Sequence, residues 1–271
     1  MAKLSRPNSQ TMENRNMALL AAVVGLLSFA ELSCLHSEPA PTAGTNSSPA
    51  SLLDLANSQT NQPVGSGSKG NLVPLRVVLP PPALHDPSII LDIPTGEHLE
   101  AFKTGPRAPL MVPRGVTNLS LGLKPLSSDP SPEKGSLQQL TNGEKKQKSR
   151  EEPVVLAPGK QWVQIELGRR CPLYAIVFWH SLWPPKVVHA VIVQVADDAD
   201  FKQDVRTLFN NDHANRLGFG IGQDREYFET FEGKLVEAGG AAARYVRLYS
   251  AGSSEDERNT YLAVEVYGLK P

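Results

Sequence analysis

From residue 153 onward the chain consists of short apolar runs, many of them alternating or β-branched, and none repeats with the period of a helix. Connections rich in Gly, Asp, Asn and Pro separate the runs. Strands are expected at 161–167, 173–180, 187–196, 205–209, 225–230, 234–238, 243–250 and 262–267. Such a series without helices predicts an all-β antiparallel sandwich, and the jelly roll is the commonest eight-stranded form of it.

The last two strands contain an acidic residue that needs an explanation. Val264 and Val266 alternate with polar or small residues, as in a half-buried strand, and Glu265 lies between them. A carboxylate in such a strand requires a compensating partner. The sequence leaves two partners open, namely a metal ion or a nearby arginine such as Arg247.

The N-terminus has the features of an export signal. Lys3, Arg6 and Arg15 precede an apolar run at 18–30, which is too short to span a bilayer and has the length of a signal-peptide core. We therefore expect an exported protein, periplasmic or on the cell surface. Cleavage after the small residues "SFA" and lipid attachment at Cys34 in "ELSC" are both open. The Ser/Pro/Thr-rich stretch after Cys34 would serve as a tether and favours the lipid anchor.

Composition divides the chain into four segments. We expect a leader at 1–34, a disordered linker at 35–71, a proline-rich extended segment at 72–114 that packs on the domain, and the sandwich at 115–271. The 27 Lys and Arg residues nearly balance the 28 Asp and Glu residues, so the sequence shows no excess of positive charge for binding nucleic acid or an anionic membrane surface. Only the lipid anchor would bring the chain to a membrane. Two cysteines exclude a disulfide framework, and Cys171 is expected to be buried.

The segments "WVQIELG", "ARYVRLYS" and "VEVYG", in this order within residues 115–269, resemble the discoidin family, also called coagulation factor V/VIII type C domains. The resemblance is to bacterial members. It implies a galactose-binding-like jelly roll whose ligand site is formed by loops at one end of the sandwich. It also implies a structural calcium ion between an early loop and the last strand, here Thr141, Asn142 and Glu265. Asn142 stands where the family pattern has Asp, which removes one negative charge from that site.

Polar residues in three connections are candidates for binding a sugar, which needs an aromatic plate and planar hydrogen-bonding groups. They are His180, Trp183, His213, Asn215, Arg258 and Asn259. An ordinary structural role is open for each, and His189, inside an expected strand, is interpreted as a structural histidine. A convergent site of His180, His189 and His213 would need coordinates to test it.

No nucleophile or dinucleotide signature is present, so the sequence predicts a protein without catalytic activity. The predicted function is binding of a carbohydrate or another envelope ligand. The alternative is a structural or adhesive envelope component that binds no small molecule. The ligand and the oligomeric state do not follow from the sequence, and the function rests on fold-level analogy.

Overall fold

A computed structural model describes residues 71–80, 95–103, 105–145, 153–181 and 186–270. The expected leader with Cys34, the linker up to residue 70, and Trp183 lie outside these residues.

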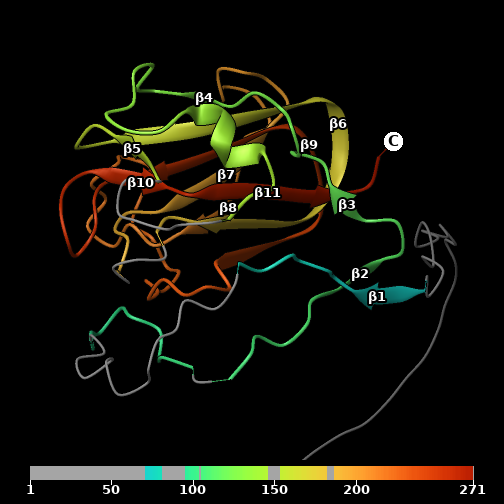
Figure 1. The fold of residues 1–271 in the computed structure, drawn as a ribbon, viewed down its shortest axis with the longest axis horizontal. Coiled ribbons are helices and arrows are strands. Elements are labelled where there is room, and N and C mark those ends of the chain that lie inside the picture. Colours follow the sequence, from blue (N-terminus) through green and yellow to red (C-terminus); the bar gives the residue numbers. More distant parts are fainter. Residues whose placement is uncertain (1–70, 81–94, 104, 146–152, 182–185, 271) are drawn as a thin grey trace, which may run out of the picture. The chain divides into compact units, whose positions relative to one another are not determined.

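The described elements are almost all strands (Figure 1). In chain order they are β1 (Leu72–Pro74), β2 (Met111–Pro113), β3 (Thr117–Asn118), β4 (Leu126–Ser127), the 3-10 helix η2 (Leu137–Thr141), β5 (Val154–Leu156), β6 (Gln161–Trp179), β7 (Ile192–Ala196), β8 (Arg206–Asn210), β9 (Lys234–Ser250), β10 (Asn259–Tyr261) and β11 (Ala263–Gly268). Across the described ranges, no helix has both the length and the apolar character needed to cross a membrane.

Seven strands form one antiparallel sheet in the order β3-β11-β6-β9-β7-β8, with β4 also paired to β6. Two smaller sheets pair β1 with β2 and β10 with β5. The pairing of β3 with β11 puts the start of the body beside its end. The all-β antiparallel sandwich is thereby confirmed.

Strands β6 and β9 are each longer than predicted, because each continues through a corner. The sequence pattern divided β6 into 161–167 and 173–180, and β9 into 234–238 and 243–250. Their shared ladder is interrupted between Glu166 and Cys171 and again between Leu173 and Ala175, and the chain turns there without leaving the sheet. Gly168, Gly239 and Gly240 have φ values of 79°, 56° and 85°, which L-residues with side chains rarely adopt. The sequence pattern indicated that these glycines connect separate strands, but in the structure they bend continuous strands.

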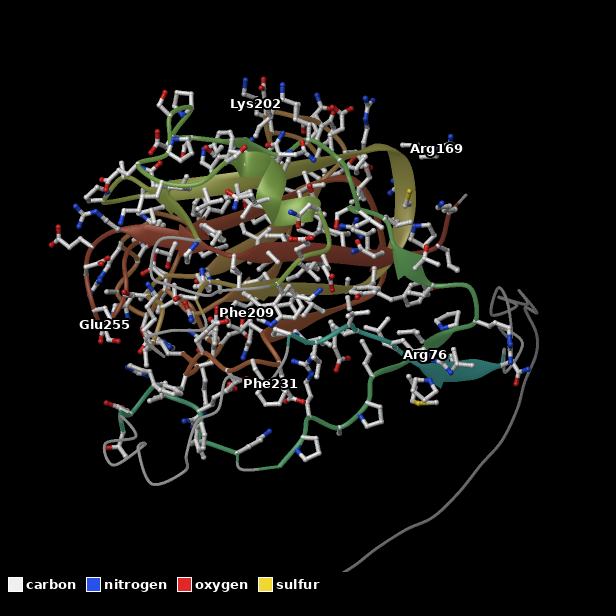
Figure 2. The ribbon with its side chains drawn as sticks, in the orientation of Figure 1. Arg76, Arg169, Lys202, Phe209, Phe231 and Glu255 are labelled. Atoms are coloured by element: carbon white, nitrogen blue, oxygen red, sulfur yellow. The ribbon has the colours of Figure 1, made fainter. Side chains whose placement is uncertain are left out.

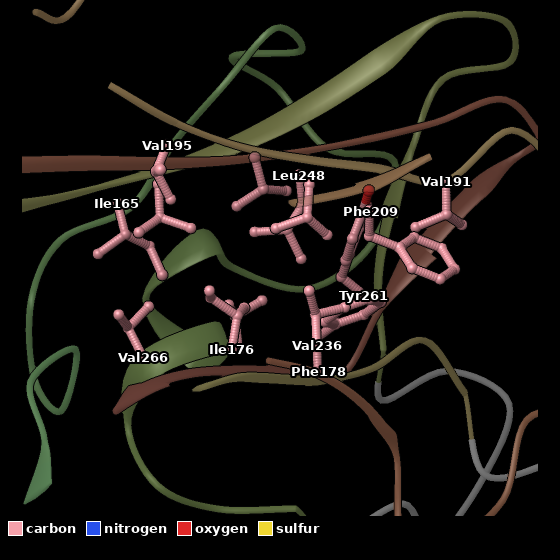
Figure 3. Packing of buried hydrophobic residues seen from close by; sticks show 14 of the residues in the cluster. Ile165, Ile176, Phe178, Val191, Val195, Phe209, Val236, Leu248, Tyr261 and Val266 are labelled. Atoms are coloured by element: carbon pink, nitrogen blue, oxygen red, sulfur yellow. The ribbon is translucent and has the colours of Figure 1, made fainter. Parts of the chain in front are cut away.

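This corner allows one sheet to form both layers of the sandwich. Figure 3 shows Ile165 and Leu248, from one half of each long strand, facing Ile176 and Val236 from the other half. All four side chains are less than 5% exposed and belong to one apolar cluster. Cys171, beside the corner, is buried as expected and is a free thiol.

Two predicted strands are shorter or absent. The run 187–196 forms a strand only from Ile192, because Ala190 has a φ of 52° and the chain leaves the sheet there. Before this kink, Val187 and Val188 form isolated bridges to Phe228 and Ser253. The predicted strand 225–230 therefore takes part only in single bridges.

The proline-rich segment contributes a small ribbon against the body. Strands β1 and β2 pair antiparallel, and Leu75 donates its N–H to the carbonyl of Leu110 at 2.8 Å. Both leucines pack on a second apolar cluster that includes Trp179 and Tyr267. This cluster lies on the face of β6 and β11 that points away from the main core.

The ladder registers place several connections together at the end of the sandwich opposite the corner. The N-terminal end of β6 pairs with the C-terminal end of β9, and that end of β9 pairs with the start of β7, which pairs with the end of β8. We call this end the loop rim; it comprises the described parts of 157–160, 180–191, 211–225 and 251–258. Figure 2 shows Glu255 of the loop rim and Arg169 of the corner on opposite sides.

Candidate functional site

The loop rim contains a polar hollow of about 390 Å³, which we call the histidine recess. Its polar lining residues come from four separate parts of the chain. They are His98, His189, Asn211, Asp212, His213, Arg216 and Glu226, with Ala190 and Ala214 completing the lining. A neighbouring hollow of about 280 Å³ shares His98 and His213 with it and adds Glu97 and Arg225.

His98 reaches the recess because residues 97–100 lie along the chain at 225–226. Glu100 donates its N–H to the carbonyl of Glu226 at 2.8 Å, and the N–H of Glu226 binds the carbonyl of His98 at 2.9 Å. The guanidinium of Arg225 also donates to the carbonyls of Glu97 and Leu99. These bonds hold a residue of the proline-rich segment at the rim of the sandwich.

The imidazoles of His98 and His213 are stacked, with ring centroids 3.9 Å apart and an angle of 16° between the planes. His98 is exposed, whereas Nε2 of His213 is buried and has no hydrogen-bond partner among the described residues. The stack therefore combines an open ring face with an unused polar atom.

Asn211 lies on the buried side of the recess and is only 1% exposed. Its side-chain Oδ1 accepts the N–H of Val191 at 2.6 Å, and its own N–H donates to the carbonyl of Val191 at 3.1 Å. These two bonds fix the carboxamide orientation at the start of β7. Its Nδ2 is buried and makes no hydrogen bond within the described part of the chain.

Asp212 shapes the loop that carries this site. Its carboxylate accepts the backbone N–H groups of Arg216 at 2.9 Å and Leu217 at 2.7 Å. Its carbonyl accepts the N–H of Gly222 at 2.9 Å, which closes the loop. A Cβ at Gly222 would lie 2.5 Å from the carbonyl oxygen of Asn210, so only glycine fits there.

On the opposite wall, Nδ1 of His189 is 2.9 Å from Oε1 of Glu226. Both side chains are about one-quarter exposed, at 29% and 24%. The sequence suggested that His189 lies inside a strand. In the structure it lies outside the strands and lines the same hollow as His213.

Arg258 lines a different hollow of about 370 Å³, which we call the charged recess. Its other charged lining residues are Glu133, Lys134, Lys186, Glu255 and Asp256. Nε of Arg258 is 2.7 Å from the carboxylate of Glu133, and both side chains are more than one-third exposed.

Two other predicted binding residues belong to the framework. His180 is 1% exposed; its Nδ1 lies 2.9 Å from the carbonyl of Thr260 and its Nε2 lies 3.1 Å from the hydroxyl of Tyr227. Burial lowers the pKa of His180 to about 3. Asn259 is also 1% exposed, and its carboxamide donates to the carbonyls of Ala157 and Gly159.

Asn215 is exposed at the loop rim, and its φ of 50° suits an asparagine in a turn. Its Oδ1 accepts the N–H of Gly220 at 2.9 Å, so the side chain shapes the glycine-rich loop. Of the five predicted sugar-binding residues that the structure describes, it brings only His213 to the histidine recess and only Arg258 to the charged recess.

Within the described ranges, no group of three or more His, Cys, Asp or Glu side chains is arranged to hold a metal ion. His180 is buried in the framework, away from the recess that His189 and His213 share. The structure therefore does not assemble the three-histidine arrangement that the sequence left open.

The predicted calcium ligands are already engaged. The carboxylate of Glu265 forms an ion pair with Nζ of Lys145, and its Oε2 accepts the hydroxyl proton of Tyr267 at 2.7 Å. Oδ1 of Asn142 accepts the N–H of Glu144, and the hydroxyl of Thr141 donates to the carbonyl of Leu123. A buried ammonium would repel a calcium ion at this position. The residues present therefore do not fit the metal.

Arg247, the alternative partner, lies elsewhere. Its Nε donates to Oε1 of Gln164 at 2.8 Å, and its guanidinium packs over the rings of Trp162 and Phe201. Of the two partners that the sequence left open for Glu265, an ion-pair partner is the one found. It is not Arg247 but Lys145, which is 120 positions away in the sequence.

The polar lining residues that sequence reasoning did not predict for the site are His98, His189, Asn211, Asp212, Arg216 and Glu226. The polar composition of 210–216 was a usable signal for Asn211 and Arg216. Nothing in the sequence links His98 to this loop, because His98 lies in the proline-rich extended segment at 72–114.

Several solved structures are similar to this chain. No family model matches the chain, and no curated protein matches it. Chitosan-binding module 1 from a chitosanase/glucanase of Paenibacillus sp. IK-5 is 16% identical, with a TM-score of 0.39 over 56% of this chain and 99% of the module. Module 2 of that enzyme, solved with chitotriose, is 17% identical, with a TM-score of 0.40 over 56% of this chain and all of the module.

The CBM32 of AlyQ, solved with 4,5-unsaturated mannuronic acid, is 11% identical, with a TM-score of 0.39 over 52% of this chain and 92% of that one. A Family 89 Glycoside Hydrolase from Clostridium perfringens is matched over only 15% of its length. Three of these neighbours are carbohydrate-binding modules that the match covers almost entirely. The glycoside hydrolase is a longer protein that the match covers only in a region of domain size. At these identities and TM-scores they assign no ligand to this chain, which is similar to them in its β-sandwich.

Proposed function

We propose that this chain is a non-catalytic carbohydrate-binding module of the cell envelope, and that the histidine recess is its ligand site. One observation carries the proposal: the carboxamide of Asn211 is 1% exposed, lines the recess, and has an Nδ2 without a partner among the described residues. A buried donor without an acceptor costs about 1–3 kcal/mol. An oxygen of a bound ligand would supply that acceptor.

The other lining groups suit a sugar. Imidazole, carboxamide and guanidinium groups are planar and hydrogen-bond to oxygens held in fixed positions. The stacked rings of His98 and His213 both belong to the lining of the hollow, and His98 is exposed. The volume of about 390 Å³ lies at the lower end of the range of small-molecule sites, which begins at about 300 Å³.

A glycan array tests the proposal with a matched pair of variants. Asn211→Asp keeps the Oδ1 that accepts the N–H of Val191 and replaces the orphan donor with an oxygen. Arg169→Gln, at the exposed corner opposite the loop rim, is the control. We expect specific retention by the unchanged protein and by Arg169→Gln, and its loss in Asn211→Asp. Retention that survives Asn211→Asp would move the site elsewhere.

A second function, adhesion to a partner protein, is favoured by the neighbouring loop. Phe219 and Ile221 are 38% and 66% exposed although hydrogen bonds of Asp212 and Asn215 hold their loop in shape. Large apolar side chains held in this way are typical of interaction surfaces. If no glycan is retained by a folded protein, and an envelope protein captured by it is lost with Phe219→Ser, the adhesive function replaces the first proposal.

Export and anchoring are proposed from the sequence alone. The apolar run at 18–30 and Cys34 carry this part of the proposal. Labelling cells with a fatty-acid analogue tests it: the unchanged chain would take up the label and Cys34→Ala would not.

A further inference from the structure

The hydrogen-bonding capacity left in the histidine recess consists mainly of donors. Nδ2 of Asn211 can only donate, and so can the guanidinium of Arg216, which is exposed and forms no ion pair with a described residue. Nε2 of His213 is also free to donate when it carries a proton. The three residues that carry these groups line one hollow.

Most side-chain acceptors of the same hollow are occupied by the protein. Both carboxylate oxygens of Asp212 accept backbone N–H groups, from Arg216 and Leu217. Oε1 of Glu226 is paired with Nδ1 of His189. Oδ1 of Asn211 accepts the N–H of Val191. A ligand that mainly offered hydroxyl donors would therefore find few free acceptors, whereas a group with several acceptor oxygens would satisfy the orphan donors.

We infer that the histidine recess selects a carboxylate-bearing sugar, a uronic acid residue, over its neutral counterpart; this inference rests on the carbohydrate-binding function proposed above. A carboxylate is planar, accepts only, and pairs with a guanidinium and an amide N–H in charge-assisted bonds. Arg216 would take one carboxylate oxygen and Nδ2 of Asn211 a second acceptor of the same residue.

The test uses pairs of oligosaccharides that differ only in the oxidation state of C6. Glucuronate, galacturonate and mannuronate tetramers are compared with the matching glucan, galactan and mannan tetramers by isothermal titration calorimetry. We expect at least one uronate to bind about tenfold or more tightly than its neutral partner.

Arg216→Gln is the decisive variant, because its side chain is exposed and its change leaves the backbone bond to Asp212 in place. It should reduce the preference for the uronate about tenfold or more, while Arg169→Gln leaves it unchanged. Equal binding of a uronate and its neutral partner would overturn the inference and leave the carbohydrate-binding function standing. Binding of neither would end both, and equal binding of polyglutamate would show non-specific charge attraction and overturn the inference.

Discussion

Nζ of Lys145 forms an ion pair with the carboxylate of Glu265, and the two side chains are only 2% and 6% exposed. The ammonium also lies 4.8 Å from the centroid of the Trp179 ring. The pair connects the segment after η2 to the last strand of the sheet, which is the connection that the family resemblance gave to calcium. In this chain a side-chain cation provides it.

Removing the lysine should destabilise the protein strongly. Lys145→Met leaves the carboxylate of Glu265 buried without its cation, and breaking a buried pair in this way costs about 3–5 kcal/mol. Lys202→Met is the matched control, because Lys202 and Asp200 form a pair that is more than 70% exposed and contributes little. Urea unfolding measures both, and the double variant Lys145→Met/Glu265→Gln should recover part of the loss.

The same pair predicts that folding does not depend on calcium. Adding a chelator to the unchanged protein should leave its thermal midpoint where it was, and adding calcium should not raise it. A midpoint that falls with the chelator, or an equal loss for Lys145→Met and Lys202→Met, would contradict the assignment of the pair.

Glu229 should make stability fall as the pH rises above neutrality. Burial raises the pKa of Glu229 from 4.5 to about 8, so between these values the folded protein holds a proton that the unfolded chain has lost. Stability from this group is fully present below pH 4.5 and is lost as the pH rises through about 8. Glu229→Gln, which keeps an acceptor for the N–H of His180, should remove this dependence.

The window between pH 6.5 and pH 8 isolates this effect, because burial lowers the pKa of His180 to about 3 and its stability contribution is lost only below 6.5. Between these two pH values the unchanged protein should lose about 2 kcal/mol more of its unfolding free energy than the variant. Denaturant titrations at both pH values measure the difference. Parallel losses in the two proteins would exclude Glu229 as the cause.

Gly222→Ala should damage the recess. The added Cβ would lie 2.5 Å from the carbonyl oxygen of Asn210 and 2.6 Å from the backbone nitrogen of Asp212, so the loop must move. We expect ligand retention to be lost, together with about 1–3 kcal/mol of stability. Gly105→Ala, where a Cβ meets nothing within 4 Å, should change neither. Retention that survives in Gly222→Ala would show that the loop shape does not determine binding.

The corner of the sandwich should depend on glycine at position 240. Its φ of 85° is strained for any residue with a Cβ, and such strain costs about 1–3 kcal/mol. Gly240→Ala should therefore lower the thermal midpoint by several degrees in a calorimetric scan, whereas Gly105→Ala should not. Because the corner is remote from the loop rim, glycan retention at low temperature should be unchanged. A midpoint unaffected by Gly240→Ala would argue against a strained corner.

The strand pattern predicted most of the fold, because alternation and β-branching are properties of neighbouring residues. The runs that became β7, β8 and β11 could be recognised in this way. The corner could not be recognised, because a glycine such as Gly168 or Gly240 is found both where a strand ends and where a strand bends. The site was harder still: His213 was predicted, but His180 and Asn259 have the same polar character and lie inside the framework.

What the sequence determined by itself is the class of fold, through local periodicity, and the need of Glu265 for a partner, through the cost of burying a carboxylate. Only the tertiary structure decided which cation pairs with Glu265 and which side chains lie together at the loop rim. Lys145 and Glu265 are 120 positions apart, and His98 stacks on His213 across a comparable separation. Such contacts depend on how strands pair and where the chain crosses the sheet, and no local sequence pattern records that.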